Sequence, residues 1–157
     1  MAAGKYIALD LALLADFSAS GLLGASAANY RIALITSAWT PNNATDTNYA
    51  NVSGSELPTG GGYTAGGGTL TGVTLTQVAG VVKFTSAPFV WTASGGGIPA
   101  WRRAVVYFLG TLNAVVNPMV GYFLGDATNI DVPATTAGNT LTVTQNALGI
   151  FGATQAP

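Results

Sequence analysis

Short strand-like runs separated by glycine and proline dominate the chain from residue 30 onward, and they most restrict how it can fold. In these runs, apolar, β-branched and aromatic residues alternate or cluster as they do in half-buried or buried strands. The runs lie at residues 30–39, 69–76, 81–86, 89–92, 104–110, 119–124 and 139–145, and a further short one at 148–151. Such punctuation predicts a mainly β fold, an antiparallel β-sandwich or a barrel-like form of it.

The first 28 residues have a different character. Residues 6–17 are rich in alanine and leucine, and their apolar positions fit a helical stripe, which predicts a short N-terminal helix. Small residues follow as a connector. A length of 157 residues suits one domain. We therefore expect one β domain over residues 1–157, with helix and connector at 1–28 and the β-sandwich at 29–157.

The chain is poor in groups that perform chemistry. Only 7% of its residues are charged, against about 25% in an ordinary soluble domain, and it has no histidine and no cysteine. Imidazole and thiolate catalysis and cysteine–histidine zinc sites are therefore excluded. A net charge of −1 argues against a nucleic-acid partner, which requires clustered lysine and arginine. We expect a protein that is not an enzyme and has no cofactor.

Three polar or glycine-rich patterns have a chemical and a structural interpretation, and we favour the structural one for each. Asp126, Asn129 and Asp131 are too few to supply the oxygens of a calcium site, so we expect a turn and no metal. The six acidic residues are scattered along the chain, so no carboxylate pair for glycoside hydrolysis is predicted. The glycine-rich residues 60–68 lack the following helix of a phosphate loop, so we expect a tight turn with positive φ angles and Tyr63 packed inward.

Two segments imitate membrane signals. Residues 5–28 resemble a secretory signal, but Asp10 and Asp16 interrupt the apolar part. Residues 104–124 are long and uncharged enough to span a bilayer, but asparagine and proline lie in the middle. Two buried strands joined by a turn explain this second segment better, and no membrane partner is expected.

Scarcity of charge indicates a surface that contacts neighbours. Trp101 follows a proline-containing loop and is the tryptophan that we expect to be exposed, against a protein neighbour before a glycan. Arg102 and Arg103 are either interface anchors or a solvated pair at a strand entrance, and in a strand they would face opposite sides. Tyr63 completes the candidate interface residues.

Several short elements occur in an order that resembles a known family. Its most distinctive piece is Gly62-Tyr63-Thr64-Ala65-Gly66-Gly67, and the others lie at residues 29–41, 48–52, 56–57, 69–71, 90–92, 103–107 and 120–122. This order is similar to that of small virion proteins of tailed bacteriophages, described as structural head or tail proteins, and it covers about residues 6–151. The resemblance implies no catalytic residues. The chain departs from it in having fewer charges and an apolar stretch at 111–116, which suggests extra buried or intersubunit surface.

Together these observations predict a structural subunit located in the virion, most simply a decoration or cement protein on the outside of the capsid. Its expected partners are copies of itself, as a homo-oligomer, and the major capsid protein or other virion proteins. A tail or neck component is the alternative within the particle, and a carbohydrate- or receptor-binding fibre module is the alternative outside this class. An exposed ladder of tryptophan and tyrosine would favour the fibre module, and a broad apolar face would favour the capsid subunit.

Overall fold

The computed structural model describes residues 4–5, 29–78, 81–112, 114–145 and 149–154, and these form mainly strands. Two single-turn 3-10 helices, η2 (Tyr49–Asn51) and η3 (Ser53–Ser55), are the helical elements of the described chain. The strands are β1 (Gly4–Lys5), β2 (Tyr30–Ile35), β3 (Gly68–Thr69), β4 (Thr74–Val78), β5 (Val81–Thr85), β6 (Phe89–Thr92), β7 (Arg103–Phe108), β8 (Thr111–Leu112), β9 (Val115–Val116), β10 (Met119–Leu124), β11 (Thr140–Val143) and β12 (Phe151–Thr154). The predicted helix at 6–17 and its connector lie outside the described residues.

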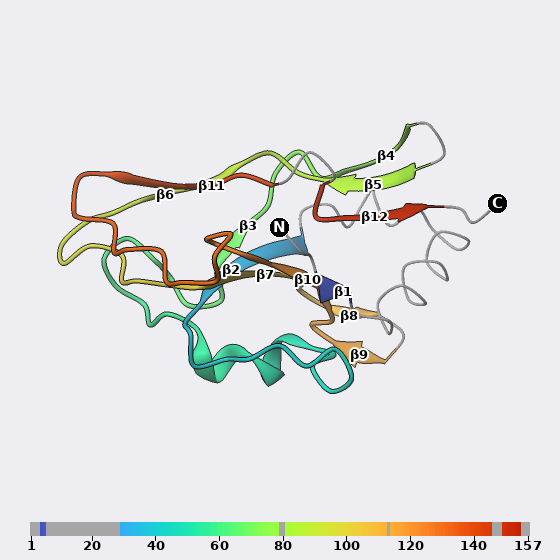
Figure 1. Ribbon diagram of the computed structural model, residues 1–157, viewed down its shortest axis with the longest axis horizontal. Coiled ribbons are helices and arrows are strands. Elements are labelled where there is room, and N and C mark those ends of the chain that lie inside the picture. Colours follow the sequence, from blue (N-terminus) through green and yellow to red (C-terminus); the bar gives the residue numbers. More distant parts are fainter. Residues whose placement is uncertain (1–3, 6–28, 79–80, 113, 146–148, 155–157) are drawn as a thin grey trace.

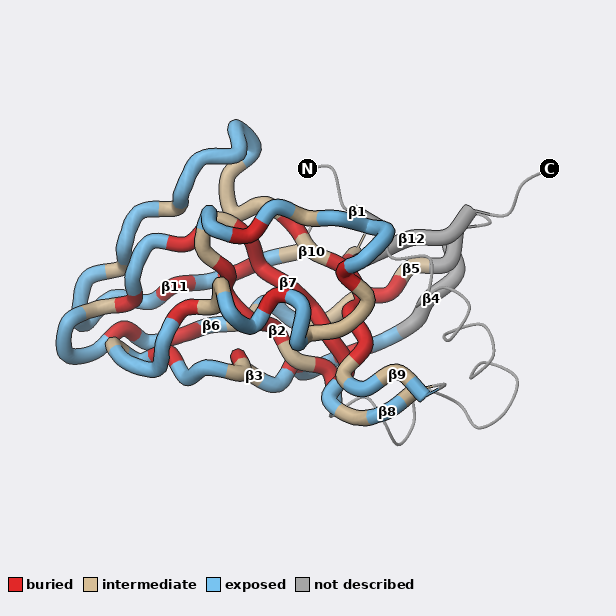
Figure 2. Tube along the Cα trace, turned by 90° about the horizontal axis from the view of Figure 1, so that it is seen from below, coloured by how far each residue is buried: buried red, intermediate tan, exposed pale blue. Residues whose placement is uncertain are grey.

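A five-stranded antiparallel sheet with the order β1-β10-β7-β2-β3 forms the centre of the fold. Its middle strand, β7, is buried along its whole length, as expected for a continuous apolar run covered on both faces. Figure 2 shows buried residues concentrated along β7 and β2. The uncharged residues 104–124 thus contain β7 and β10, the two predicted strands, joined by the small β8–β9 hairpin where a turn was expected. Among the described residues, no helix is long and apolar enough to cross a membrane.

Two smaller antiparallel sheets, β11-β6 and β12-β5-β4, run above the five-stranded sheet in Figure 1. Aromatic side chains connect the two smaller sheets to the five-stranded sheet and to the loop that packs on it. The rings of Tyr30 on β2 and Phe84 on β5 lie 4.9 Å apart, centroid to centroid. Trp91 on β6 lies 5.8 Å from the ring of Tyr63. The buried residues of all these elements form one hydrophobic cluster, so the core lies where the sheets meet.

Two strand predictions are confirmed residue for residue, at Phe89–Thr92 and Met119–Leu124. The predicted strand at 69–76 is wrong, because β3 ends at Thr69 and β4 begins at Thr74. Gly72, with φ of +60°, lies between them in a conformation that no strand contains. The apolar positions also change phase at this glycine, from Leu70 to Val73 and Leu75, so the run is not one continuous alternation.

The apolar stretch at 111–116 forms the β8–β9 hairpin. Leu112 packs against the core, whereas Val116 on the other strand is 59% exposed. Asn117 closes the hairpin, because its side-chain oxygen accepts a hydrogen bond from the Gly110 N–H at 3.0 Å. The stretch is therefore only partly buried within the chain, and the prediction of intersubunit surface stays open for its exposed strand.

Candidate functional site

One carboxylate holds the glycine-rich loop against β2. Glu56 lies opposite Ile35 in an isolated β-bridge. Its side chain accepts hydrogen bonds from the Tyr63 hydroxyl at 2.5 Å, from the Gly66 N–H at 2.9 Å and from the Tyr49 hydroxyl. The Tyr63 oxygen also accepts a bond from the Leu34 N–H at 2.9 Å. Tyr63 therefore connects the loop to a strand of the central sheet, with both its donor and its acceptor used.

The tyrosines around Glu56 are held in their neutral form. Burial, followed by the hydrogen bond to Glu56, raises the pKa of Tyr63 and of Tyr49 well above the usual range. Burial also raises the pKa of Tyr107, whose ring stacks on Tyr49 at 4.2 Å and whose hydroxyl donates to the Gly66 carbonyl at 2.6 Å. A phenol that resists ionisation is a poor base and a poor nucleophile. We therefore assign the hydrogen bonds of these three tyrosines to fixing the loop.

The loop itself requires glycine where it touches β2. Gly67 has φ of +68°, and a Cβ atom there would lie 2.0 Å from the Ile32 carbonyl oxygen. The next element is the strand β3, and Tyr63 is 1% exposed. The structure thus confirms the tight turn with positive φ angles and an inward Tyr63. It follows that Tyr63 is not available as an accessible interface residue.

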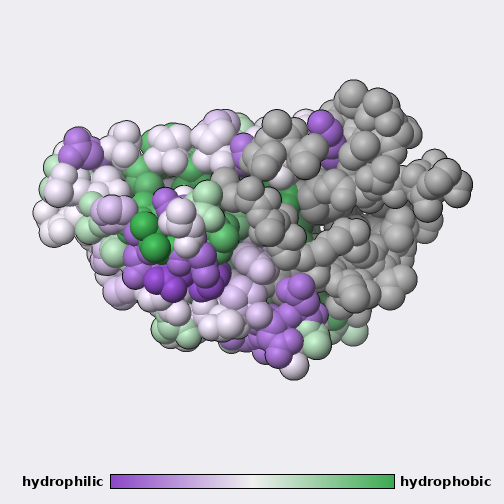
Figure 3. Space-filling view, in the orientation of Figure 1, coloured by the Kyte–Doolittle hydropathy of each residue, from purple (hydrophilic) through white to green (hydrophobic). Residues whose placement is uncertain are grey.

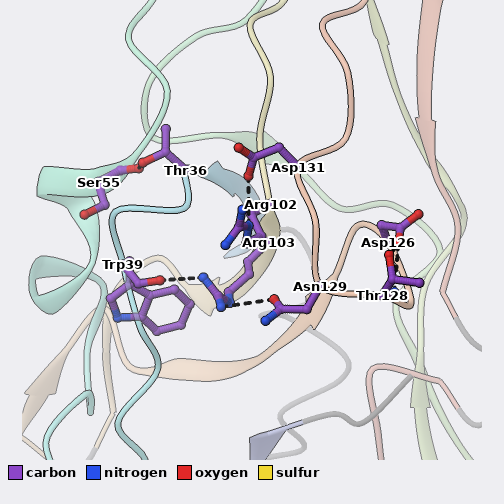
Figure 4. Close-up of polar contacts among 9 residues, drawn as sticks. All are labelled: Thr36, Trp39, Ser55, Arg102, Arg103, Asp126, Thr128, Asn129 and Asp131. Atoms are coloured by element: carbon purple, nitrogen blue, oxygen red, sulfur yellow. Dashed lines mark hydrogen bonds and ion pairs between the residues drawn. The ribbon is translucent and has the colours of Figure 1, made fainter.

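Arg103, the first residue of β7, is buried at 6% exposure. One terminal nitrogen donates to the Trp39 carbonyl at 2.5 Å and the other to the Asn129 side-chain oxygen at 3.2 Å (Figure 4). The guanidinium carbon lies 5.9 Å from the Trp39 ring centroid, within cation–π range. Burial, and then the neighbouring Arg102, lowers the pKa of Arg103. Arg103 therefore joins two loops to the sheet, with its charge enclosed.

Arg102 turns the other way, as predicted for adjacent residues at a strand entrance. Its Nε lies 2.8 Å from an Asp131 oxygen, and both side chains stay partly exposed (Figure 4). This ion pair fixes the β10–β11 connection beside β7. Of the four predicted interface residues, Arg102 is the one with an accessible side chain.

The prediction that Trp101 is exposed is wrong, because its side chain is 4% exposed. Trp101 and Val132 exchange backbone hydrogen bonds at 3.3 and 2.7 Å, which draws the loop after Pro99 into an isolated β-bridge. A Cβ atom on Gly125 would lie 2.8 Å from the Trp101 ring, so glycine there makes room for the indole. The loop composition suggested exposure, and the distant partner Val132 overrides it.

The acidic residues of the predicted turn are bonded one by one. Asp126 accepts bonds from the hydroxyl and the N–H of Thr128, and these bonds lower its pKa. Asp131 pairs with Arg102, and Asn129 with Arg103. Within the described part of the chain, no three acidic side chains gather as a metal site would need.

Every charged side chain that the structure describes contacts a partner within the protein. Asp46 accepts bonds from the Trp39 indole N–H at 3.0 Å and the Asn42 N–H at 2.8 Å. Arg31 donates to the Gly67 carbonyl at 3.4 Å, and Lys83 also has a partner. Sequence reasoning missed Glu56 and Asp46 as loop anchors, although Glu56 stands just before the distinctive glycine element. Most of the charged side chains that the structure describes therefore hold loops in place.

Comparison with other proteins gives no family: no protein-family model, curated protein or solved structure matches the chain. What the described surface can do is therefore argued from its own residues.

Beside Trp101 lies a hollow of about 220 Å³ between the end of β10 and strand β11. Apolar side chains and two threonines form its wall. The lining residues are Trp101, Phe123, Leu124, Gly125, Val132, Leu141, Thr142, Val143 and Thr144. In the view of Figure 3, hydrophobic residues lie set back on the left half of the molecule, next to a group of hydrophilic residues. No charged residue lines the hollow, so it suits a neutral, apolar contact and no charge-dependent chemistry.

Proposed function

We propose that this protein is a non-enzymatic structural subunit of a bacteriophage particle, attached to the outside of the capsid as a decoration protein and associated with copies of itself. The observation that carries the proposal is the internal use of charge described above. Because the described charged groups already have partners within the fold, we place the docking surfaces on neutral residues, such as the exposed Thr92, Thr140 and Thr142. Docking through short neutral side chains immobilises little side-chain entropy. The resemblance to tailed-phage virion proteins agrees with this role.

We further infer that the sheets pack as a β-sandwich. The single hydrophobic cluster and the contact of Tyr30 with Phe84 across two sheets support this arrangement. A sandwich gives a rigid body whose loops gather at its ends, which suits a subunit that is bound in many copies.

The alternatives are a tail or neck component and a carbohydrate- or receptor-binding fibre module. Glycan-binding surfaces use exposed aromatic rings, and all three tryptophans of this chain are at most 6% exposed. This burial favours the capsid subunit over the fibre module. A neutral docking surface would suit a tail or neck component equally well, so an experiment must distinguish these locations from the capsid.

The decisive experiment locates the protein in purified particles. Heads and tails of a phage that carries this sequence are separated on a gradient, and the protein is quantified in each by mass spectrometry. We expect it with the heads, at a copy number in a simple ratio to the major capsid protein. Recombinant protein should also bind heads that lack it, with an affinity that changes only a few-fold between low and high salt, because neutral contacts are not screened. Recovery only with tails, or absence from particles, would refute the decoration role.

A further inference from the structure

Strand β11 has one edge without a described partner. It pairs with β6 in a regular antiparallel register, Thr140↔Thr92 to Val143↔Phe89. Just before the strand, the Ala93 N–H donates to the Asn139 carbonyl at 2.8 Å. Because hydrogen-bonded and non-hydrogen-bonded pairs alternate, Leu141 and Val143 direct their backbone groups toward β6. Those of Thr140 and Thr142 point away from it, and among the described residues no backbone group bonds to them.

The opposite edge of this two-stranded sheet, formed by β6, is covered by the glycine-rich loop. The Ser94 N–H, just after β6, donates to the Gly61 carbonyl at 3.0 Å, and a Cβ on Gly62 would lie 2.1 Å from the Thr92 carbonyl oxygen. The glycine-rich loop thus lies directly against the β6 edge. Only the β11 edge of the sheet is left open by the described chain.

Strand β11 itself carries none of the usual protections of a free edge. Proteins usually block a free edge with a charged side chain, a proline or a bulge. The chain has no charged residue after Asp131, and β11 contains no proline and no shift of register. The strand is also two-faced, since Leu141 and Val143 are buried while Thr140 and Thr142 are exposed. Such an edge is a template for another strand.

We propose that β11 pairs in antiparallel fashion with β11 of a second copy, about a two-fold axis at Thr142. The outward backbone groups belong to Thr140, Thr142 and, by continuation, Thr144. The register that uses all of them places Thr142 opposite Thr142 and Thr140 opposite Thr144 of the second copy. The two small sheets then become one continuous sheet, β6-β11-β11-β6. This contact gives the proposed virion subunit its self-association, and its biological role rests on that proposed function.

A second copy fits the edge better than an arbitrary strand does. The added strand must present neutral polar residues to solvent and small apolar residues to the core side, and β11 has this pattern. In the register centred on Thr142, Leu141 of one copy lies opposite Val143 of the other on the core side. These side chains meet over the hollow that Leu141, Val143 and Phe123 line, so apolar surface there is covered together with the backbone groups.

A cysteine placed at the axis tests the pairing directly. The chain contains no cysteine, so Thr142→Cys introduces the sole thiol of each copy. Paired residues on adjacent strands have Cα atoms about 5.5 Å apart, which a disulfide can span. We expect mild oxidation to give a covalent dimer at least about tenfold faster for Thr142→Cys than for Thr92→Cys. Thr92 is the matched control, because it is an exposed threonine on the same face, one strand further from the edge.

Association in the reduced state provides a second measurement. Thr142→Lys brings two positive charges together at the axis, and we expect it to raise the dimer dissociation constant at least about tenfold in sedimentation experiments. Thr92→Lys should leave the constant within about twofold, because its charges are further apart. Equal crosslinking of the two cysteine variants, or a monomeric wild-type protein, would overturn the pairing.

The experiments can refute the β11 pairing and the proposed function independently of each other. A dimer crosslinked through Thr142→Cys that does not bind phage heads supports the pairing and refutes attachment to the capsid. Binding to heads without preferential crosslinking at position 142 supports attachment and overturns the pairing.

Discussion

The loop-bearing end of the five-stranded sheet and the β6–β11 pair differ in whether their polar groups have partners within the described chain. At the sheet end, Glu56 and Arg103 bind loops to β2 and β7 through hydrogen bonds within the chain. At β11, threonine alternates with leucine and valine, and the outward backbone groups have no described partner. Few charged residues are present, and Glu56 and Arg103 serve the first region, whereas β6 and β11 contain no charged residue and the outer edge of β11 is open in the described chain. The contrast predicts that substitutions in the first region change stability and that substitutions in the second change association.

The largest effect is expected for Trp101→Ala. Removing a buried tryptophan side chain loses packing and leaves a cavity, so we expect the free energy of unfolding to fall by about 4 kcal/mol. Urea unfolding at a concentration at which the protein is monomeric measures this loss. Trp101→Phe, which keeps an aromatic ring, should recover part of the stability. Unchanged stability with loss of binding to heads would instead place Trp101 at an interface.

A smaller effect is expected from alkaline pH. Tyr63 and Tyr49 have raised pKa values in the folded protein, whereas in the unfolded chain they ionise near the ordinary value of about 10. Below that pH their contribution to stability is complete, and it is lost as the pH rises further, because the unfolded state releases protons that the folded state keeps. For the buried Tyr63 the loss is about 1.4 kcal/mol per pH unit above 10, and for the more exposed Tyr49 it is less.

Urea midpoints between pH 8 and pH 11, with tyrosinate absorbance as a second probe, measure this dependence. Tyr63→Phe has no hydroxyl to ionise, so its stability should fall less steeply over the same range, although it starts from a lower value. A slope unaffected by this substitution would contradict the role assigned to the Glu56 cluster.

The smallest effect is expected for Arg102→Ala. Its ion pair with Asp131 is partly exposed, and such pairs contribute less than about 1 kcal/mol. A double-mutant cycle with Asp131→Ala isolates the pair, and added salt should weaken it. A coupling energy well above this limit would move Arg102 into the group of structural anchors. Loss of binding to heads at unchanged stability would make it an interface residue.

Local patterns predicted what local forces decide. The strands at β6 and β10 and the inward Tyr63 follow from alternation and turn chemistry, and the structure has them as predicted. The strand predicted at 69–76 failed for a local reason, the positive φ of Gly72, whereas the other errors lie where a distant partner decides. Trp101 is buried because Val132 pairs with it, and Arg103 is enclosed by Trp39 and Asn129. No spacing in the sequence records these partners, and the same holds for the open edge of β11, which depends on how whole sheets are ordered.

The pairing of β7 with β2 has a consequence for how the chain reaches its fold. The partners in this ladder, from Tyr30↔Phe108 to Ile35↔Arg103, are separated by about seventy residues of chain. During synthesis, β2 leaves the ribosome long before β7, and its apolar residues have no β7 partner until then. Folding rates fall as the sequence separation of contacts rises, so closure of the central sheet must be late, slow and cooperative. Until that closure, unpaired strands of neighbouring nascent chains compete with the correct partner.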